Sequence, residues 1–299
     1  MTAVTNVTFE TLKMLRAENP QVIREALAAR QRRELLRGDG RLLIIAADHP
    51  ARGALGVGSN PVAMGSRREL LERLRVALTR PGVDGVLGTP DIIEDLAVMG
   101  LLDDKIAVGS MNRGGLKSSV FEYDDRFTGY TFERMHKHGL DFAKTLLRIN
   151  LDDLGTAETL EKTAHVIDEA NDWGIPIMVE PFMSSWQNNR ASNHLTTEDI
   201  LLSVSIAQGL GSTSALTWLK LPIAPDMAKV MDGTTLPTLL LGGEVEDDQE
   251  RAFESWNEAL DLPGVRGLVV GRSLLYPAKG DVVEAVDQAS KMVHGTLGN

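Results

Sequence analysis

The stretch Leu42-Leu43-Ile44-Ile45-Ala46-Ala47 is an unbroken apolar run that ends in Asp48-His49-Pro50. Seven further short apolar runs follow it, and helix-forming segments such as 67–79 and 156–173 lie between most of them. Continuous apolar runs, in contrast to alternating ones, are typical of strands that a parallel sheet buries on both faces. Eight such units in 299 residues predict an α/β fold, a closed (β/α)8 TIM barrel.

The seven later runs stop at glycine, proline or polar residues. They cover residues 83–87, 105–108, 142–147, 176–179, 215–223, 238–241 and 267–270. A doubly wound sheet is the alternative fold. It is weakened because no Gly-x-Gly-x-x-Gly pattern follows the first run.

Residues 1–40 precede the first run and are polar and helix-forming. Thr8 is placed to begin one short helix, and Asn19-Pro20 has the character of the cap and first position of a second, expected over 21–36. We therefore predict a helical N-terminal extension over 1–40 and a (β/α)8 barrel over 41–299. The extension is expected to cover the bottom of the barrel or to form an oligomer contact, and a homo-oligomer is expected.

The composition narrows the classes of protein and partner. Hydrophobic residues make up 43% of the chain, an ordinary value for a globular protein. The net charge of −11 argues against nucleic acid as a partner, because proteins that bind its phosphate backbone are usually basic. The absence of cysteine excludes disulfides, thiolate metal sites and cysteine nucleophiles. Neither a signal-peptide pattern nor a bilayer-spanning apolar run is found, so a cytoplasmic protein without a membrane partner is expected.

Four ionisable residues lie near the carboxyl ends of predicted strands, where (β/α)8 barrels carry their chemistry. They are Asp48, Lys144, Glu180 and Lys220. Burial and a neighbouring Lys144 ammonium would lower the pKa of Lys220 and make its amine a nucleophile. Each residue also has an ordinary explanation: a lysine that reaches solvent, a loop cap for Asp48, a rim salt bridge for Glu180. Four ionisable groups at one level of a barrel are harder to explain by packing.

The last two predicted strands end in glycines and an arginine that suit an anion site. Gly242 and Gly243 follow the seventh run, and Gly271 and Arg272 follow the eighth. Glycines let backbone N–H groups approach a phosphate closely, and an arginine can clamp it through two N–H donors. Ordinary turn glycines are the alternative explanation.

Further polar residues follow the predicted strands at the same face of the barrel. Arg148 is another candidate for binding a substrate or its phosphate, and the remaining candidates are His49, Arg52, Asn112 and Arg113. The loop over 183–197 is long for a βα connection and is expected to face the substrate through Trp186 and Arg190. A polar loop without a role is the alternative.

The runs around these residues resemble a known family. Gly139-Leu140-Asp141-Phe142-Ala143-Lys144-Thr145-Leu146-Leu147, the Glu180 run, Trp218-Leu219-Lys220 and Gly267-Leu268-Val269-Val270-Gly271-Arg272 resemble class I (Schiff-base) aldolases of the tagatose-bisphosphate aldolase group, within the DeoC/FbaB/LacD superfamily. The chain also resembles an actinobacterial (β/α)8 group associated with inositol-catabolism genes. It departs from the aldolase pattern over 147–150 and near Gly242, so the resemblance leaves the sugar open.

The resemblance implies an aldehyde-lyase that needs neither a metal nor another cofactor. Lys220 would form the Schiff base, Glu180 would transfer the proton, and Asp48 and Lys144 would complete the site. The implied reaction cleaves a phosphorylated ketose to dihydroxyacetone phosphate and an aldehyde. Candidate substrates are 2-deoxy-5-keto-gluconate 6-phosphate and ketose bisphosphates. The six histidines show no metal-ligand spacing, which also disfavours a metal-dependent aldolase. A deoxyribose-phosphate-type aldolase and a non-catalytic, aldolase-like sensor of metabolites are the alternatives.

Overall fold

The computed structural model describes residues 7–113, 115–188, 190–243 and 249–295. Eight parallel strands form a closed ring, which confirms the predicted (β/α)8 barrel. Around the ring they follow the order β1, β2, β3, β4, β5, β7, β8, β9, and β9 pairs again with β1. The strands are β1 (Leu42–Ala46), β2 (Gly85–Gly88), β3 (Ile106–Ser110), β4 (Phe142–Ile149), β5 (Ile177–Gln187), β7 (Thr217–Leu221), β8 (Thr238–Leu241) and β9 (Val265–Val270).

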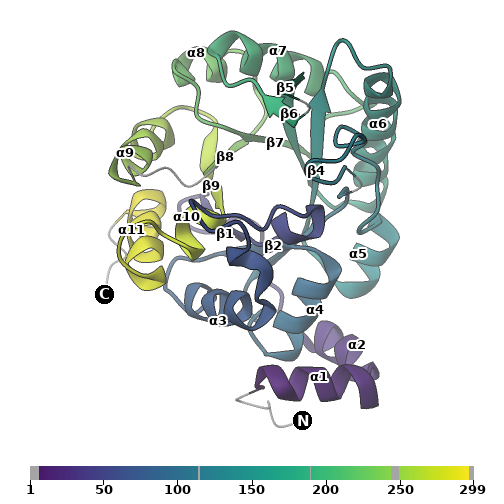
Figure 1. The fold of residues 1–299 in the computed structure, drawn as a ribbon, viewed down its shortest axis with the longest axis vertical. Helices are drawn as coiled ribbons and strands as arrows, with labels where there is room; N and C mark the ends of the chain where they lie inside the picture. The colour runs from purple at the N-terminus through teal and green to yellow at the C-terminus, as the bar shows by residue number, and fades with distance from the viewer. Residues whose placement is uncertain (1–6, 114, 189, 244–248, 296–299) are drawn as a thin grey trace.

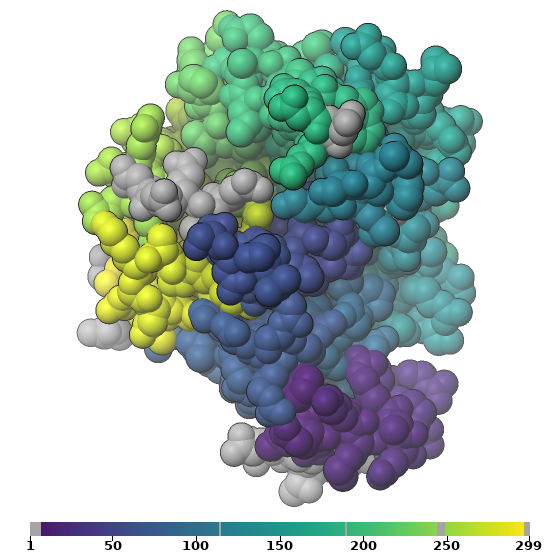
Figure 2. All heavy atoms as spheres, in the orientation of Figure 1, coloured from purple at the N-terminus to yellow at the C-terminus, as the bar shows by residue number. Residues whose placement is uncertain are grey.

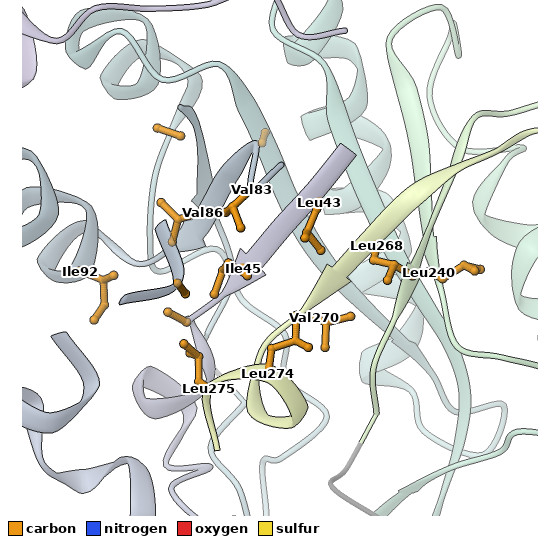
Figure 3. Packing of buried hydrophobic residues seen from close by; sticks show 14 of the residues in the cluster. Leu43, Ile45, Val83, Val86, Ile92, Leu240, Leu268, Val270, Leu274 and Leu275 are labelled. Atoms are coloured by element: carbon orange, nitrogen blue, oxygen red, sulfur yellow. The ribbon is translucent and has the colours of Figure 1, made fainter. Parts of the chain in front are cut away.

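Alternate residues of β1 explain why its apolar run is continuous. Leu42 and Ile44 belong to the cluster inside the barrel, together with residues such as Phe142 and Met178. Leu43 and Ile45 belong to the larger cluster between the strands and the helices. Figure 3 shows Leu43 and Ile45 beside Leu268 and Val270 of β9. A strand that is buried on both faces needs apolar side chains at every position.

Helices surround the ring of strands (Figure 1). In chain order they are α3 (Arg67–Leu78), α4 (Pro90–Val98), α5 (Phe132–His138), α6 (Gly155–Trp173), α7 (Thr197–Ala207), α8 (Met227–Asp232), α9 (Gln249–Leu260), α10 (Arg272–Leu275) and α11 (Val282–His294). Two short 3-10 helices, η1 (His49–Arg52) and η2 (Ala63–Gly65), follow β1. None of the helices in the described parts of the chain is long and apolar enough to cross a membrane.

The N-terminal extension begins with α1 (Phe9–Glu18) and α2 (Gln21–Ala29), as predicted. Thr8 caps α1 through a hydrogen bond from the backbone N–H of Thr11. Both helices lie outside the ring beside α4 and project from the body of the molecule (Figures 1 and 2).

The prediction that the second helix continues to residue 36 is wrong, because the helix ends at Ala29. Beyond it, buried ion pairs hold the chain in an irregular path. Arg30 donates to Asp141 at 2.9 Å, and Arg33 donates to Asp84 at 2.6 Å. Leu35 packs against the cluster inside the barrel. The segment after α2, and not the helices, therefore covers the bottom of the barrel, where tertiary contacts override helix propensity.

The connection predicted over 183–197 is a hairpin, apart from Asn189, which lies outside the described residues. β5 continues past the ring to Gln187, and β6 (Arg190–Asn193) pairs with it in antiparallel orientation. Ser185 lies opposite Ser192 in this ladder. The hairpin extends the sheet above the carboxyl ends of the strands, where the predicted functional residues converge.

Candidate active site

A cavity of about 450 Å³ opens at the carboxyl ends of the barrel strands. Asp48, Glu180 and Lys220 line it, and all three are buried. Lys144 lies next to the cavity and has no exposed surface. The four ionisable residues that the sequence places near the carboxyl ends of the strands are therefore brought together.

Two lysines share one carboxylate at the centre of the site. Glu180 on β5 lies between Lys144 on β4 and Lys220 on β7, and these three strands are neighbours in the ring. The Lys144 ammonium is 2.5 Å from Oε2 of Glu180, and the Lys220 ammonium donates to Oε1. The buried cluster therefore holds more positive than negative charge when both amines are protonated.

The environment favours loss of a proton from a lysine. Burial lowers the pKa of Lys220, and Arg113 and Arg272 add to this effect, although the Glu180 carboxylate opposes it. Burial and the charge of Arg113 also place the pKa of Lys144 well below its usual value. Burial alone would raise the pKa of Glu180, but the two ammonium groups outweigh it and lower that pKa. Glu180 is thus an anion, and a neutral lysine beside it is chemically accessible.

Asp48 is held by a second group of side chains. Its carboxylate forms an ion pair with Arg113 and accepts a hydrogen bond from the Ser110 hydroxyl at 3.0 Å. Arg113 also donates to the Ser110 hydroxyl at 3.1 Å, and the Lys144 ammonium is 3.7 Å from Asp48. Sequence reasoning named Arg113 only as a residue of this face and missed Ser110. The inward position of Ser110 at the end of β3 was the available signal.

The predicted phosphate-binding residues all border the cavity. A Cβ on Gly271 would lie 2.3 Å from the backbone oxygen of Ala46, so only glycine lets β9 approach β1 this closely. Gly243 has a φ of +66°, and its carbonyl accepts a hydrogen bond from Arg272 at 3.2 Å. Arg272 begins α10, which has four residues. With Gly242, these residues border the cavity at the β8–β9 side, and their role in binding phosphate stays a prediction.

Arg148 also borders the cavity, but its guanidinium already has carboxylate partners. It is bound by Asp125, with Nε 2.9 Å from Oδ2, and lies 3.6 Å from Glu122. Sequence reasoning missed both acidic residues, because the segment between β3 and α5 has no strand or helix periodicity. Asn112 joins β3 to β4 by exchanging hydrogen bonds with the backbone of Leu146. Arg148 and Asn112 thus hold this side of the cavity in place.

The hairpin borders the cavity through residues other than those predicted. Ala191, Ser192 and Asn193 line it, whereas Trp186 and Arg190 do not. The Trp186 ring packs edge-to-face on Tyr123, with 4.7 Å between ring centroids. In the described parts of the chain, no group of three or more histidine or acidic side chains is arranged to hold a metal ion.

Several known proteins are similar to this chain. Cgl0159 from Corynebacterium glutamicum has 59% identity, with 97% of each chain covered and a TM-score of 0.94. A Schiff-base-forming fructose-1,6-bisphosphate aldolase has 18% identity, covers 91% of this chain and 100% of its own, and gives a TM-score of 0.65. An archaeal fructose-1,6-bisphosphate aldolase, with its catalytic lysine bound to the carbinolamine intermediate, has 18% identity. The match covers 91% of this chain and 99% of the aldolase chain, with a TM-score of 0.66. At this identity, the two aldolases show a shared barrel fold.

No functionally curated protein matches the chain. The Cgl0159-like family model, however, matches residues 40–290, which include every strand of the barrel and all four ionisable residues at its centre. The chain therefore belongs to the Cgl0159-like family.

Proposed function

We propose that this protein is a class I aldolase that cleaves a phosphorylated ketose through a Schiff base on Lys220. The observation that carries the proposal is the pair of buried lysines on the single carboxylate of Glu180. The aldolase-like barrel agrees with it. Of the two lysines, Lys220 is the nucleophile, because it lines the cavity and Lys144 does not.

The reaction begins with addition of the neutral Lys220 amine to the substrate ketone. Loss of water from the carbinolamine gives an iminium ion. Glu180 then takes the proton from the hydroxyl one carbon beyond the bond to be broken, the carbon–carbon bond cleaves, and the iminium accepts the electron pair as an enamine. Protonation and hydrolysis of the enamine release the ketone product and restore Lys220. A positioned general base of this kind contributes about 10²- to 10⁴-fold.

The neighbouring side chains support these steps. Lys144 holds Glu180 in place after Lys220 has become an imine, because its amine contacts the other carboxylate oxygen. Asp48, held by Arg113 and Ser110, binds substrate hydroxyls and assists proton transfers around the imine. Gly242, Gly243, Gly271 and Arg272 hold the substrate phosphate at the β8–β9 side of the cavity.

The proposed products and candidate substrates follow from the resemblance to class I aldolases. The phosphate and the ketone lie in the same half of the substrate, so cleavage releases dihydroxyacetone phosphate and an aldehyde. Candidate substrates are 2-deoxy-5-keto-gluconate 6-phosphate and ketose bisphosphates. A substrate panel that includes 2-deoxyribose 5-phosphate separates this reaction from cleavage by a deoxyribose-phosphate-type enzyme.

The test is to trap the imine. Incubation with dihydroxyacetone phosphate and sodium borohydride, followed by peptide mass mapping, is expected to place a reduced adduct on Lys220. An adduct on Lys144 would exchange the roles of the two lysines. If neither lysine is modified by any phosphorylated ketose that binds, the covalent mechanism is wrong.

A further inference from the structure

The cavity is rich in positive charge, although the whole chain carries −11. Six cationic side chains among the described residues line it: Arg52, Arg113, Lys117, Arg148, Lys220 and Arg272. The acidic side chains that line it are Asp48, Glu122 and Glu180. A cavity with this imbalance attracts an anionic ligand whatever the net charge of the protein.

Most of the charges that line the cavity are paired. Arg113 contacts Asp48, Arg148 contacts Asp125 and Glu122, and Lys220 contacts Glu180. Arg52 differs. It is half-buried in η1, its Nε atom is buried without a hydrogen-bond partner, and no described carboxylate lies within ion-pair distance of its guanidinium. A desolvated guanidinium without a counter-ion is costly, so this position is suited to a ligand that supplies the missing anion.

The position of Arg52 separates it from the predicted phosphate site. Burial lowers the pKa of Arg52 and the charge of Arg148 on β4 adds to this effect, whereas the carboxylates of Asp125, Glu180 and Glu122 oppose it. These charges belong to β4, to β5 and to the segment between β3 and α5. The backbone carbonyl of Arg52 also accepts a hydrogen bond from the N–H of Lys117, a residue that follows β3. β4 lies opposite β9 in the ring, and β7, which carries Lys220, lies midway between them. Lys220 lines the same cavity as both sides, so a ligand that spans it from the β8–β9 side to the β4 side can present its carbonyl to Lys220.

We infer that the cavity binds a second anionic group of the substrate on Arg52 and Lys117, at the end remote from Gly242, Gly243 and Arg272. This inference rests on the proposed function, because it names the substrate class for that site. The substrate is then a ketose phosphate whose far end carries an acid, either a carboxylate or a second phosphate. After cleavage, the aldehyde product keeps this acid.

Three ligands test the inference by calorimetry in a Lys220→Met background, where no imine can form. Fructose 1-phosphate has a neutral far end, fructose 1,6-bisphosphate has a far phosphate, and 2-deoxy-5-keto-gluconate 6-phosphate has a far carboxylate. At least one of the doubly anionic ligands is expected to bind about 10- to 100-fold more tightly than fructose 1-phosphate, because its acid forms charge-assisted hydrogen bonds. The tighter of the two identifies the acid.

Adding Arg52→Gln is expected to remove this advantage and to leave the affinity for fructose 1-phosphate unchanged. Arg52→Lys is expected to retain part of it, because it keeps the charge but not the planar fork. Arg126→Gln is the matched control, since Arg126 is exposed, pairs with Asp124 at 2.6 Å and does not line the cavity. Thermal unfolding is expected to show no loss of stability in Arg52→Gln, which separates ligand binding from a structural role.

Two results would overturn the inference. One is that neither doubly anionic ligand binds the Lys220→Met protein more tightly than fructose 1-phosphate. The other is that Arg52→Gln weakens all three ligands equally. Both are independent of the proposed Schiff base, which fails only if borohydride traps no adduct on Lys220 or Lys144 of the wild-type protein.

Discussion

Two charged clusters that share β4 lie at the mouth of the barrel and differ in their balance of charge. In one, Lys144 and Lys220 share Glu180, so two cations have one carboxylate. In the other, Arg148 has both Asp125 and Glu122. The first cluster can release a proton without leaving a buried ion unpaired, whereas the second cannot. We infer that the cation-rich cluster carries the chemistry and that the acid-rich cluster holds the segment between β3 and α5 against β4.

The largest effect is expected from Lys220→Met, which removes the proposed nucleophile. Turnover of any cleaved ketose phosphate should fall by at least about 10⁴-fold, as for loss of a covalent nucleophile in other enzymes, and the borohydride adduct should disappear. Lys105→Met is the matched control. Lys105 is a half-buried lysine at the other end of the barrel, where it donates to the carbonyl of Val83 at 2.6 Å. Normal turnover by Lys220→Met would move the chemistry to another residue, Lys144 first.

A smaller effect is expected from Glu180→Gln. Turnover should fall by about 10²- to 10⁴-fold, because the general base is lost. Trapping of dihydroxyacetone phosphate should respond differently. The Glu180 carboxylate raises the pKa of Lys220, so its removal lowers that pKa and leaves the amine neutral at lower pH.

The measurement for Glu180→Gln is the rate of borohydride-dependent inactivation as a function of pH. The acid limb of this pH profile should lie at lower pH in Glu180→Gln than in the wild type. A uniform loss of trapping at every pH, with no shift of the limb, would mean that Glu180 only maintains the structure of the site.

Substitution in the acid-rich cluster around Arg148 is expected to lower stability, whereas substitution in the cation-rich cluster lowers turnover. Arg148→Met leaves Asp125 and Glu122 buried without their cation, and the free energy of unfolding should fall by about 3 kcal/mol or more. Denaturant unfolding measures this loss. Arg126→Met, which breaks an exposed pair with Asp124, is the control and should cost no more than about 1 kcal/mol. An Arg148→Met protein of unchanged stability would contradict the structural role of this cluster.

The barrel and the central residues could be predicted from the sequence because two simple rules apply to them. Strands that are buried on both faces are apolar throughout, as β1 is. The residues at their carboxyl ends must then converge, which brings Asp48, Glu180 and Lys220 to one cavity.

The remaining features depend on contacts that no local pattern encodes. The helix predicted over 21–36 ends early because Arg30 and Arg33 reach carboxylates far away in the sequence. The pairing of Asp48 with Arg113, and of Arg148 with Asp125, depends on how loops fold over the strand ends. Candidate residues could therefore be named from the sequence, but which of them neutralise one another could not. Arg52 was one name among several until its lack of a described counter-ion distinguished it.

A third cluster, at the other end of the barrel, is paired like that of Arg148 but contains a cation that can titrate. His294 on α11 lies 2.6 Å from Asp39 and 3.1 Å from Asp84, and these carboxylates raise its pKa, although burial acts in the opposite direction. Because the folded-state pKa is the higher one, the stabilisation is fully present below the unfolded value of about 6.5 and is lost as pH rises through the folded pKa. Its size should not exceed about 1 kcal/mol, since water screens the partly exposed Asp39. Denaturant unfolding at pH 6 and pH 9 measures the loss. The free energy of unfolding should fall between these pH values in the wild type and should fall less in His294→Gln. Equal losses in both proteins would show that His294 stays neutral between its two carboxylates.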